Sequence, residues 1–159
     1  MWLGALPAAR PDLEEGLALY TPDQHRALVF RMGHDLGVGC RLYGAMTLWL
    51  LGYPEQALVY LHDTLVLAQE LAHPFTLAYA RCLAALVYQR RRDVPAVHEQ
   101  AEAAVVLATE QGFPLWVAVG MCVRRWALAR ARRGWRRSAR GSSPAKPAGQ
   151  RCLSHTCAP

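Results

Sequence analysis

The chain has 159 residues, 53% hydrophobic and 19% charged, which fits one domain with a buried core. No apolar run approaches the roughly 18 residues that a membrane-spanning helix needs, and the opening Met1–Pro7 lacks the basic start of a signal peptide, so we expect a cytoplasmic protein. The net charge of +6 is uneven: residues 1–123 hold all 12 acids and eight arginines, whereas residues 124–159 hold ten bases and no acid. The first part is therefore mildly acidic, and the basic charge belongs to the end of the chain.

Residues 1–35 predict an N-terminal lead-in of short helices. Asp12 is expected to cap a helix over residues 13–20, since a carboxylate accepts the free amides of a first turn. Gly33 and Gly37 are expected to flank a loop. This lead-in is unlike the segments that follow it.

Residues 36–131 predict helical hairpins that repeat with a period of about 40 residues. The segment Leu67–Phe75 recurs as Leu107–Leu115, and each copy carries Leu-Ala, a Glu two positions on, and a Pro before a large apolar residue. Apolar residues recur at three- and four-residue steps over residues 38–51, 55–71, 76–90, 96–111 and 115–132. We expect an all-α fold of antiparallel hairpins similar to tetratricopeptide repeats, an α-solenoid fragment with units at residues 36–72, 73–112 and, in part, 113–131.

Residues 132–159 predict a basic, disordered tail, because they are rich in Gly, Pro, Ser and Arg and show no helical period. Cys152, His155 and Cys157 give too few ligands for zinc, and we expect no metal site. Arginines with Trp126 and Trp135 favour at most nonspecific contact with nucleic acid.

Several separated motifs, in order, resemble one known region. They are Leu19–His25, Gly33–Val38, Leu48–Leu58, Ala72–Phe75 and Glu110–Trp116. Together they resemble the C-terminal tetratricopeptide region of bacterial signalling proteins that join a class III adenylate/guanylate cyclase domain to a predicted AAA-type ATPase. The similarity covers roughly residues 12–130.

The resemblance implies a regulatory region without catalysis, since the cyclase and ATPase sites lie in other domains of such proteins. It stops near Arg130, where the family continues with an acidic turn. Residues 134–137 read Gly-Trp-Arg-Arg instead, and GC-rich codons for them read one base out of frame give Val-Glu-Glu. We therefore expect a truncated fragment with a frame-shifted tail.

The polar candidates for chemistry favour structural roles. His25, His34 and Asp35 show no metal-ligand spacing, and we expect His25 and Asp35 to bond to exposed helix ends. Cys82 and Cys122 coincide when the chain is shifted by 40 residues, which predicts one repeated packing position. Five cysteines without a CxxC pair fit a reducing compartment. We expect no enzyme, no cofactor and no small-molecule substrate.

In a solenoid the first helix of each hairpin lines the concave surface, which is the usual site for a partner. The residues expected there are Leu42, Met46, Trp49, Cys82, Leu86, Gln89, Cys122 and Trp126, with Trp49 and Trp126 as candidate anchors. The alternative is that these side chains belong to the core or pack against further repeats.

The sequence thus favours a protein-binding scaffold that contacts a protein partner or other domains of a parent protein. A second hypothesis is a helical-repeat arm of an ATPase-type transcription regulator, with nucleic-acid contact through the basic C-terminus.

Overall fold

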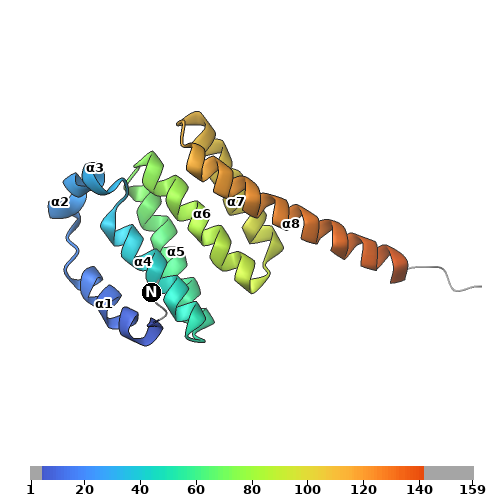
Figure 1. Cartoon of the computed structure of the whole chain (residues 1–159), viewed down its shortest axis with the longest axis horizontal. Coiled ribbons are helices and arrows are strands. Elements are labelled where there is room, and N and C mark those ends of the chain that lie inside the picture. Colours follow the sequence, from blue (N-terminus) through green and yellow to red (C-terminus); the bar gives the residue numbers. More distant parts are fainter. Residues whose placement is uncertain (1–4, 142–159) are drawn as a thin grey trace, which may run out of the picture.

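The computed structural model describes residues 5–141, which form α-helices, one 3-10 turn and no strand (Figure 1). The N-terminal helices are α1 (Leu6–Ala18), α2 (Pro22–His25) and α3 (Val29–Met32). The longer helices are α4 (Leu36–Leu50), α5 (Pro54–Glu70), α6 (Pro74–Arg91), α7 (Val94–Glu110) and α8 (Pro114–Gly141). The prediction of an all-α chain is confirmed. In the described part of the chain, no helix is both long and apolar enough to cross a membrane.

The starts of the long helices are fixed by side chains that satisfy free backbone amides. Asp35 before α4, His73 before α6 and Asp93 before α7 each accept the N–H of the residue three positions on. A proline occupies the first or second position of α5, α6 and α7, where its missing N–H costs nothing. These helices therefore begin within two residues of the predicted positions.

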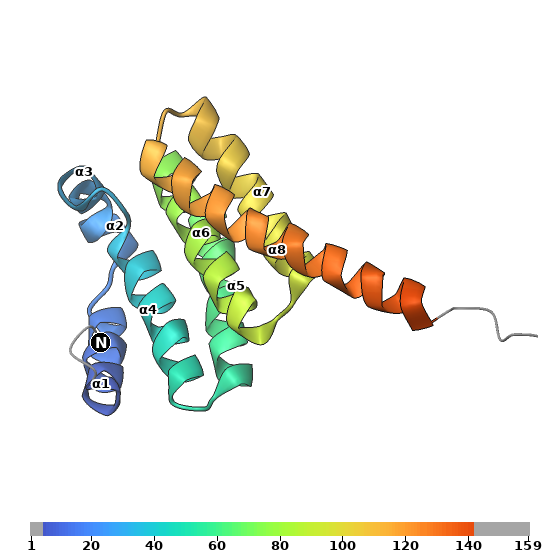
Figure 2. The same ribbon diagram turned by 45° about the vertical axis from the view of Figure 1, so that its right-hand side comes forward.

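Helices α4 and α5 form one antiparallel hairpin and α6 and α7 another, and the two hairpins lie side by side (Figures 1 and 2). Helix α8 packs on α6 and α7, and α1 packs on α4. One core cluster, which includes Leu42, Leu61 and Tyr79, joins α4, α5 and α6. A second, which includes Ala85 and Val123, joins α6, α7 and α8.

The 40-residue period of the sequence is also a period of burial in the second helix of each hairpin. Four positions of α5 and the four that follow 40 residues later in α7 are all 0% exposed. These pairs are Ala57 and Val97, Leu61 and Ala101, Thr64 and Ala104, and Ala68 and Ala108. The two hairpins thus bury matching faces.

The lead-in differs from the prediction at both of its ends. Helix α1 begins at Leu6 rather than after Asp12 and continues through Pro11. Gly37 is the second residue of α4 rather than part of a loop. A Cβ at this glycine would lie 2.6 Å from the ring of Tyr20, so the close approach of the lead-in to α4 is the reason for glycine there.

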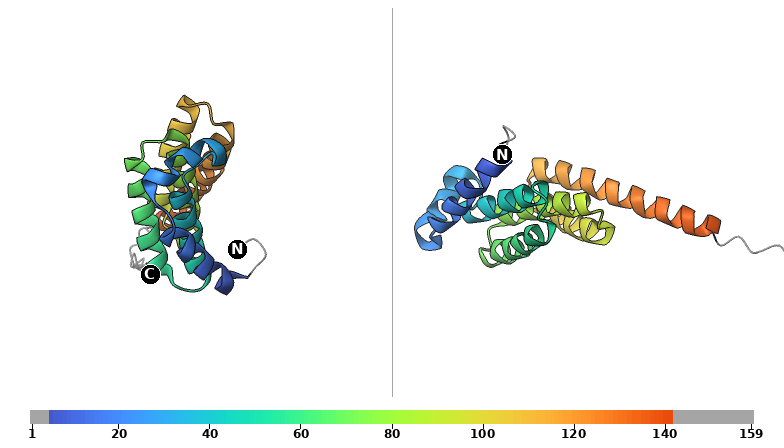
Figure 3. Two further views of the ribbon diagram at one scale, coloured as in Figure 1. Left: turned by 90° about the vertical axis from the view of Figure 1, so that its left-hand side faces the viewer. Right: turned by 90° about the horizontal axis from the view of Figure 1, so that it is seen from below.

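The predicted end of the last helix near residue 131 is also wrong, because α8 continues to Gly141. Arginine and alanine are good helix formers, and they outweigh single unfavourable residues such as Gly134 and Ser138. Figure 3 shows this end of α8 extending beyond the other helices. The remainder of the predicted tail, residues 142–159 with Cys152, His155 and Cys157, lies outside the described residues.

Candidate functional site

Asp35 and His25 bond to helix ends, as predicted. The buried Asp35 carboxylate accepts the N–H of Val38 at 3.0 Å and the hydroxyl of Tyr20 at 2.8 Å. His25 Nδ1 accepts the N–H of Thr21 at 3.0 Å. The two oxygens of Asp35 therefore join the lead-in to α4, and both are already used by neighbouring donors.

His34 does not lie with Asp35 in a cluster that faces a cavity. Its ring packs against Tyr79 of α6, with 4.7 Å between the ring centroids. Burial raises the pKa of the Tyr79 hydroxyl above its ordinary value, and the neighbouring Tyr43 adds to this shift. Among the described residues, no three His, Cys, Asp or Glu side chains are close enough together to hold a metal ion.

Cys82 and Cys122 do not share one packing environment, which corrects the prediction for this pair. Cys82 is fully buried, with its sulfur 3.5 Å from the carbonyl oxygen of Trp116, and burial raises the pKa of its thiol to about 12. Cys122 is exposed. The sequence period aligns the two residues, but only the first has a helix packed over it.

The side chains predicted to line a partner groove do not form one exposed surface. Leu42 is 0% exposed, because α4 is enclosed by α5 and α6, so its predicted place on a surface is wrong. Met46 and Trp49 are half-buried against the first core cluster, and Gln89 is also half-buried. Trp126 packs on the second core cluster, with the Arg130 guanidinium 5.3 Å from its ring centroid.

The outer face of α8 is exposed at positions whose equivalents in α4 and α6 are buried. Ala78, Cys82 and Ala85 of α6 are 0% exposed, as are the residues 40 positions earlier in α4, Val38, Leu42 and Ala45. The residues 40 positions later in α8 are all exposed, and so is the neighbouring Leu115 at 62%. We call Leu115, Ala118, Cys122 and Arg125 the free face of α8. It is a mostly apolar strip, and the positions of α4 and α6 that are equivalent to Ala118, Cys122 and Arg125 are covered.

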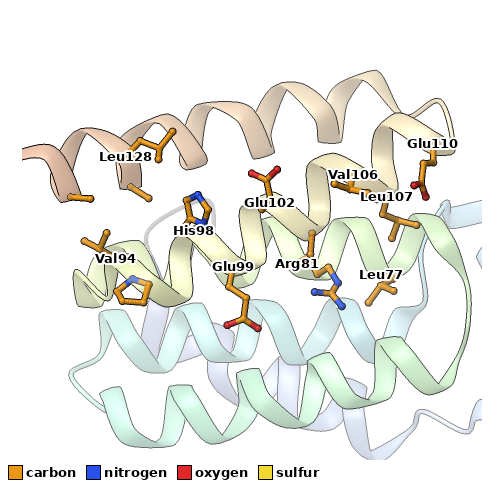
Figure 4. Close-up of a pocket in the computed structure, with 14 residues that line it drawn as sticks. Leu77, Arg81, Val94, His98, Glu99, Glu102, Val106, Leu107, Glu110 and Leu128 are labelled. Carbon is orange, nitrogen blue, oxygen red and sulfur yellow. The ribbon is translucent and has the colours of Figure 1, made fainter.

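A groove of about 940 Å³ runs along α7, bordered by α6 and α8 (Figure 4). Its apolar lining includes Val106, 49% exposed, and Leu128, 41% exposed. Polar side chains of α7 line it as well, among them His98, Glu99, Glu102 and Glu110. We call these 14 residues the α7 groove; besides those named they are Leu77, Arg81, Val94, Pro95, Ala103, Leu107, Ala127 and Ala131.

The α7 groove carries an excess of carboxylates. Glu102 forms an ion pair with Arg124 of α8 at 2.9 Å, and Arg81 bonds to Gln100 at 3.3 Å. For Glu99 and Glu110, no ion pair is formed within the described part of the chain. A groove lined by apolar side chains and by three glutamates suits a helix that carries both apolar and basic residues.

Reasoning from the sequence missed this groove, because it assigned the site to the first helix of each hairpin. The α7 groove instead belongs mainly to a second helix. The available signal was the spacing of Glu99, Glu102, Val106 and Glu110, which follows one stripe of a helix.

Searches among models of protein families, curated proteins and solved structures found no match to this chain.

Proposed function

We propose that this chain is a non-catalytic helical-repeat scaffold that binds a protein partner at the free face of α8. The observation that carries the proposal is the contrast between α6 and α8. Ala78, Cys82 and Ala85 are completely covered in α6, whereas their counterparts in α8 are exposed. A repeat array offers the uncovered face of its last helix to whatever packs there next.

Matching burial in the two hairpins supports a tetratricopeptide-like solenoid as the architecture. The second helices α5 and α7 bury the same four positions, and the first helices α4 and α6 share six buried positions. Small residues at several of these positions, such as Ala45, Ala85, Ala68 and Ala108, let neighbouring backbones approach closely.

A non-catalytic role is supported by how the polar candidates are used. Asp35 caps α4 and holds Tyr20, and His73 caps α6. The raised pKa of the Cys82 thiol disfavours the thiolate that nucleophilic chemistry requires. Cys40, Cys82 and Cys122 are free thiols, which fits the reducing cytoplasm, where we place the protein.

The setting we propose is a regulatory region of a cyclase/ATPase signalling protein, and its support is the ordered set of sequence motifs that ends at Glu110–Trp116. In such a setting the partner of the free face is another helical segment of the same assembly. Leu115 and the small residues Ala118 and Cys122 give a helix an apolar strip that it can approach closely.

Site-specific photo-crosslinking tests this proposal in cells that make the protein. A benzophenone amino acid replaces Ala118 on the free face or, as the matched control, Val59, which is 60% exposed on α5. We expect a discrete protein adduct from position 118 and none from position 59. Equal adduct patterns from both positions, or no adduct from position 118, would contradict a docking role for this face.

A further inference from the structure

The end of α8 forms an arm that extends away from the bundle (Figures 1 and 3). Ala127 and Ala131 still line the α7 groove together with Val94, the first residue of α7. Residues 132–141 continue past that point, and ten residues at 1.5 Å each make an arm about 15 Å long. We call residues 132–141 the arm.

The arginines and the alanine of the arm favour a helix by their intrinsic propensity, but its like charges and the lack of packing oppose one. It carries Arg132, Arg133, Arg136, Arg137 and Arg140 and no acidic residue. Like charges four positions apart repel each other along a helix. A helix segment this short also gains little stability without packing. An acidic contact surface would remove both difficulties.

The chain offers such a surface in the α7 groove, with Glu99, Glu102 and Glu110 along it. The arm cannot reach that surface within its own molecule, because α8 extends past α7 and away from the other helices (Figure 2). The charges fit each other, but only between two molecules.

We propose that a second copy of this chain occupies the α7 groove: the arm of each molecule lies along the α7 groove of the other. Exchange of identical arms around a two-fold axis satisfies both grooves at once, and two-fold dimers are the commonest homo-oligomers. The arginine-rich arm lies beside the carboxylates, and the exposed Val106 and Leu128 provide apolar area for the contact.

This dimer rests on the proposed scaffold function but uses a different surface. The α7 groove is bordered by the side of α8 that carries Leu128, whereas the partner face carries Ala118 and Cys122. Loss of the dimer would therefore leave crosslinking from position 118 unchanged, and loss of that crosslinking would leave the dimer unchanged.

The full-length protein is tested by sedimentation velocity over a series of concentrations and salt concentrations. We expect a dimer at low salt whose dissociation constant rises at least about tenfold with added salt, because screening weakens contacts between exposed charges. A protein that stays monomeric at low salt up to its solubility limit would overturn the proposal. So would a dimer that salt leaves unchanged.

Charge-reversal variants then locate the contact. Glu99→Lys with Glu110→Lys reverses the charge of the groove, and Arg132→Glu with Arg136→Glu lowers the net charge of the arm from +5 to +1. Each double variant alone is expected to be monomeric. A mixture of the two is expected to form a heterodimer, because the unchanged arm of the groove variant then meets the unchanged groove of the arm variant. The matched control, Asp12→Lys with Asp63→Lys, makes the same charge change at exposed positions outside the groove and is expected to stay dimeric. Dimers that survive the groove variant, or are lost equally in the control, would show that the groove is not the contact.

Discussion

Ala72 and Gly112 lie 40 residues apart and both adopt the left-handed backbone conformation, with φ of 50° and 72°. Each lies two residues after the second helix of a hairpin and two residues before the proline that begins the next helix. Glycine adopts this conformation freely, whereas for other L-residues it costs about 1–2 kcal/mol. The same turn is thus built once with its best residue and once with a strained one.

Replacing Ala72 with glycine is expected to stabilise the protein. The relief of about 1–2 kcal/mol is offset by about 0.4–1 kcal/mol of added freedom in the unfolded chain, which leaves a gain of up to about 1.6 kcal/mol. The reverse change, Gly112→Ala, should destabilise by a similar amount, since an added Cβ meets nothing within 4 Å and only the backbone conformation matters. Urea denaturation measures both variants. A less stable Ala72→Gly protein would show that the turn is not strained.

The two aspartates that cap helices are expected to differ in importance. Asp93→Ala removes one cap and should cost about 1 kcal/mol. Asp35→Ala removes a cap and also leaves the Tyr20 hydroxyl without its 2.8 Å acceptor, so a cost of about 2–4 kcal/mol is expected. Thermal or urea unfolding of the two variants gives the comparison. Equal losses would mean that the bond between Tyr20 and Asp35 contributes nothing to stability.

Stability is expected to fall at alkaline pH because of the buried Cys82 thiol. Its pKa is about 12 in the folded chain against an ordinary value of 9.0, so the unfolded chain loses this proton more readily. The stabilising contribution is complete below pH 9 and is lost as the pH rises towards 12. Cys82→Ala should therefore make the decline between pH 9 and 11 shallower, by up to about 1.4 kcal/mol per pH unit. Part of the decline in stability is expected to remain in this variant, because burial also raises the pKa of Tyr79.

The control for this pH series is Cys122→Ala, which removes an exposed thiol. It is expected to leave the slope of stability against pH as in the wild type. An unchanged slope in the Cys82 variant would contradict the assignment of the raised pKa to burial at this position.

The helices of the two hairpins were predictable because local chemistry decides them. Prolines 54, 74, 95 and 114 and the capping Asp93 mark helix starts in the sequence itself. The arm was missed for the opposite reason, since overall composition favoured disorder while the local preference of arginine and alanine favours helix. Likewise, Pro11 obscured the start of α1 at Leu6.

The candidate site was harder to predict, because exposure depends on neighbours that a periodic pattern does not name. Leu42 was expected on a surface and is enclosed, and Cys122 was expected to share the packing position of Cys82 but is exposed. Both errors come from the same cause. A repeat period tells which positions are equivalent, but tertiary packing decides which of them a further helix covers.

The most direct test of the docking role is the reactivity of the Cys122 thiol towards a maleimide, followed peptide by peptide with mass spectrometry. In the purified protein, Cys122 should react quickly and the buried Cys82 slowly. In intact cells that make the protein, we predict that Cys122 is protected, because a partner covers the free face of α8, while a Val59→Cys control on α5 stays reactive. A Cys122 that reacts as fast in cells as in the purified protein would contradict a docking role for the free face of α8.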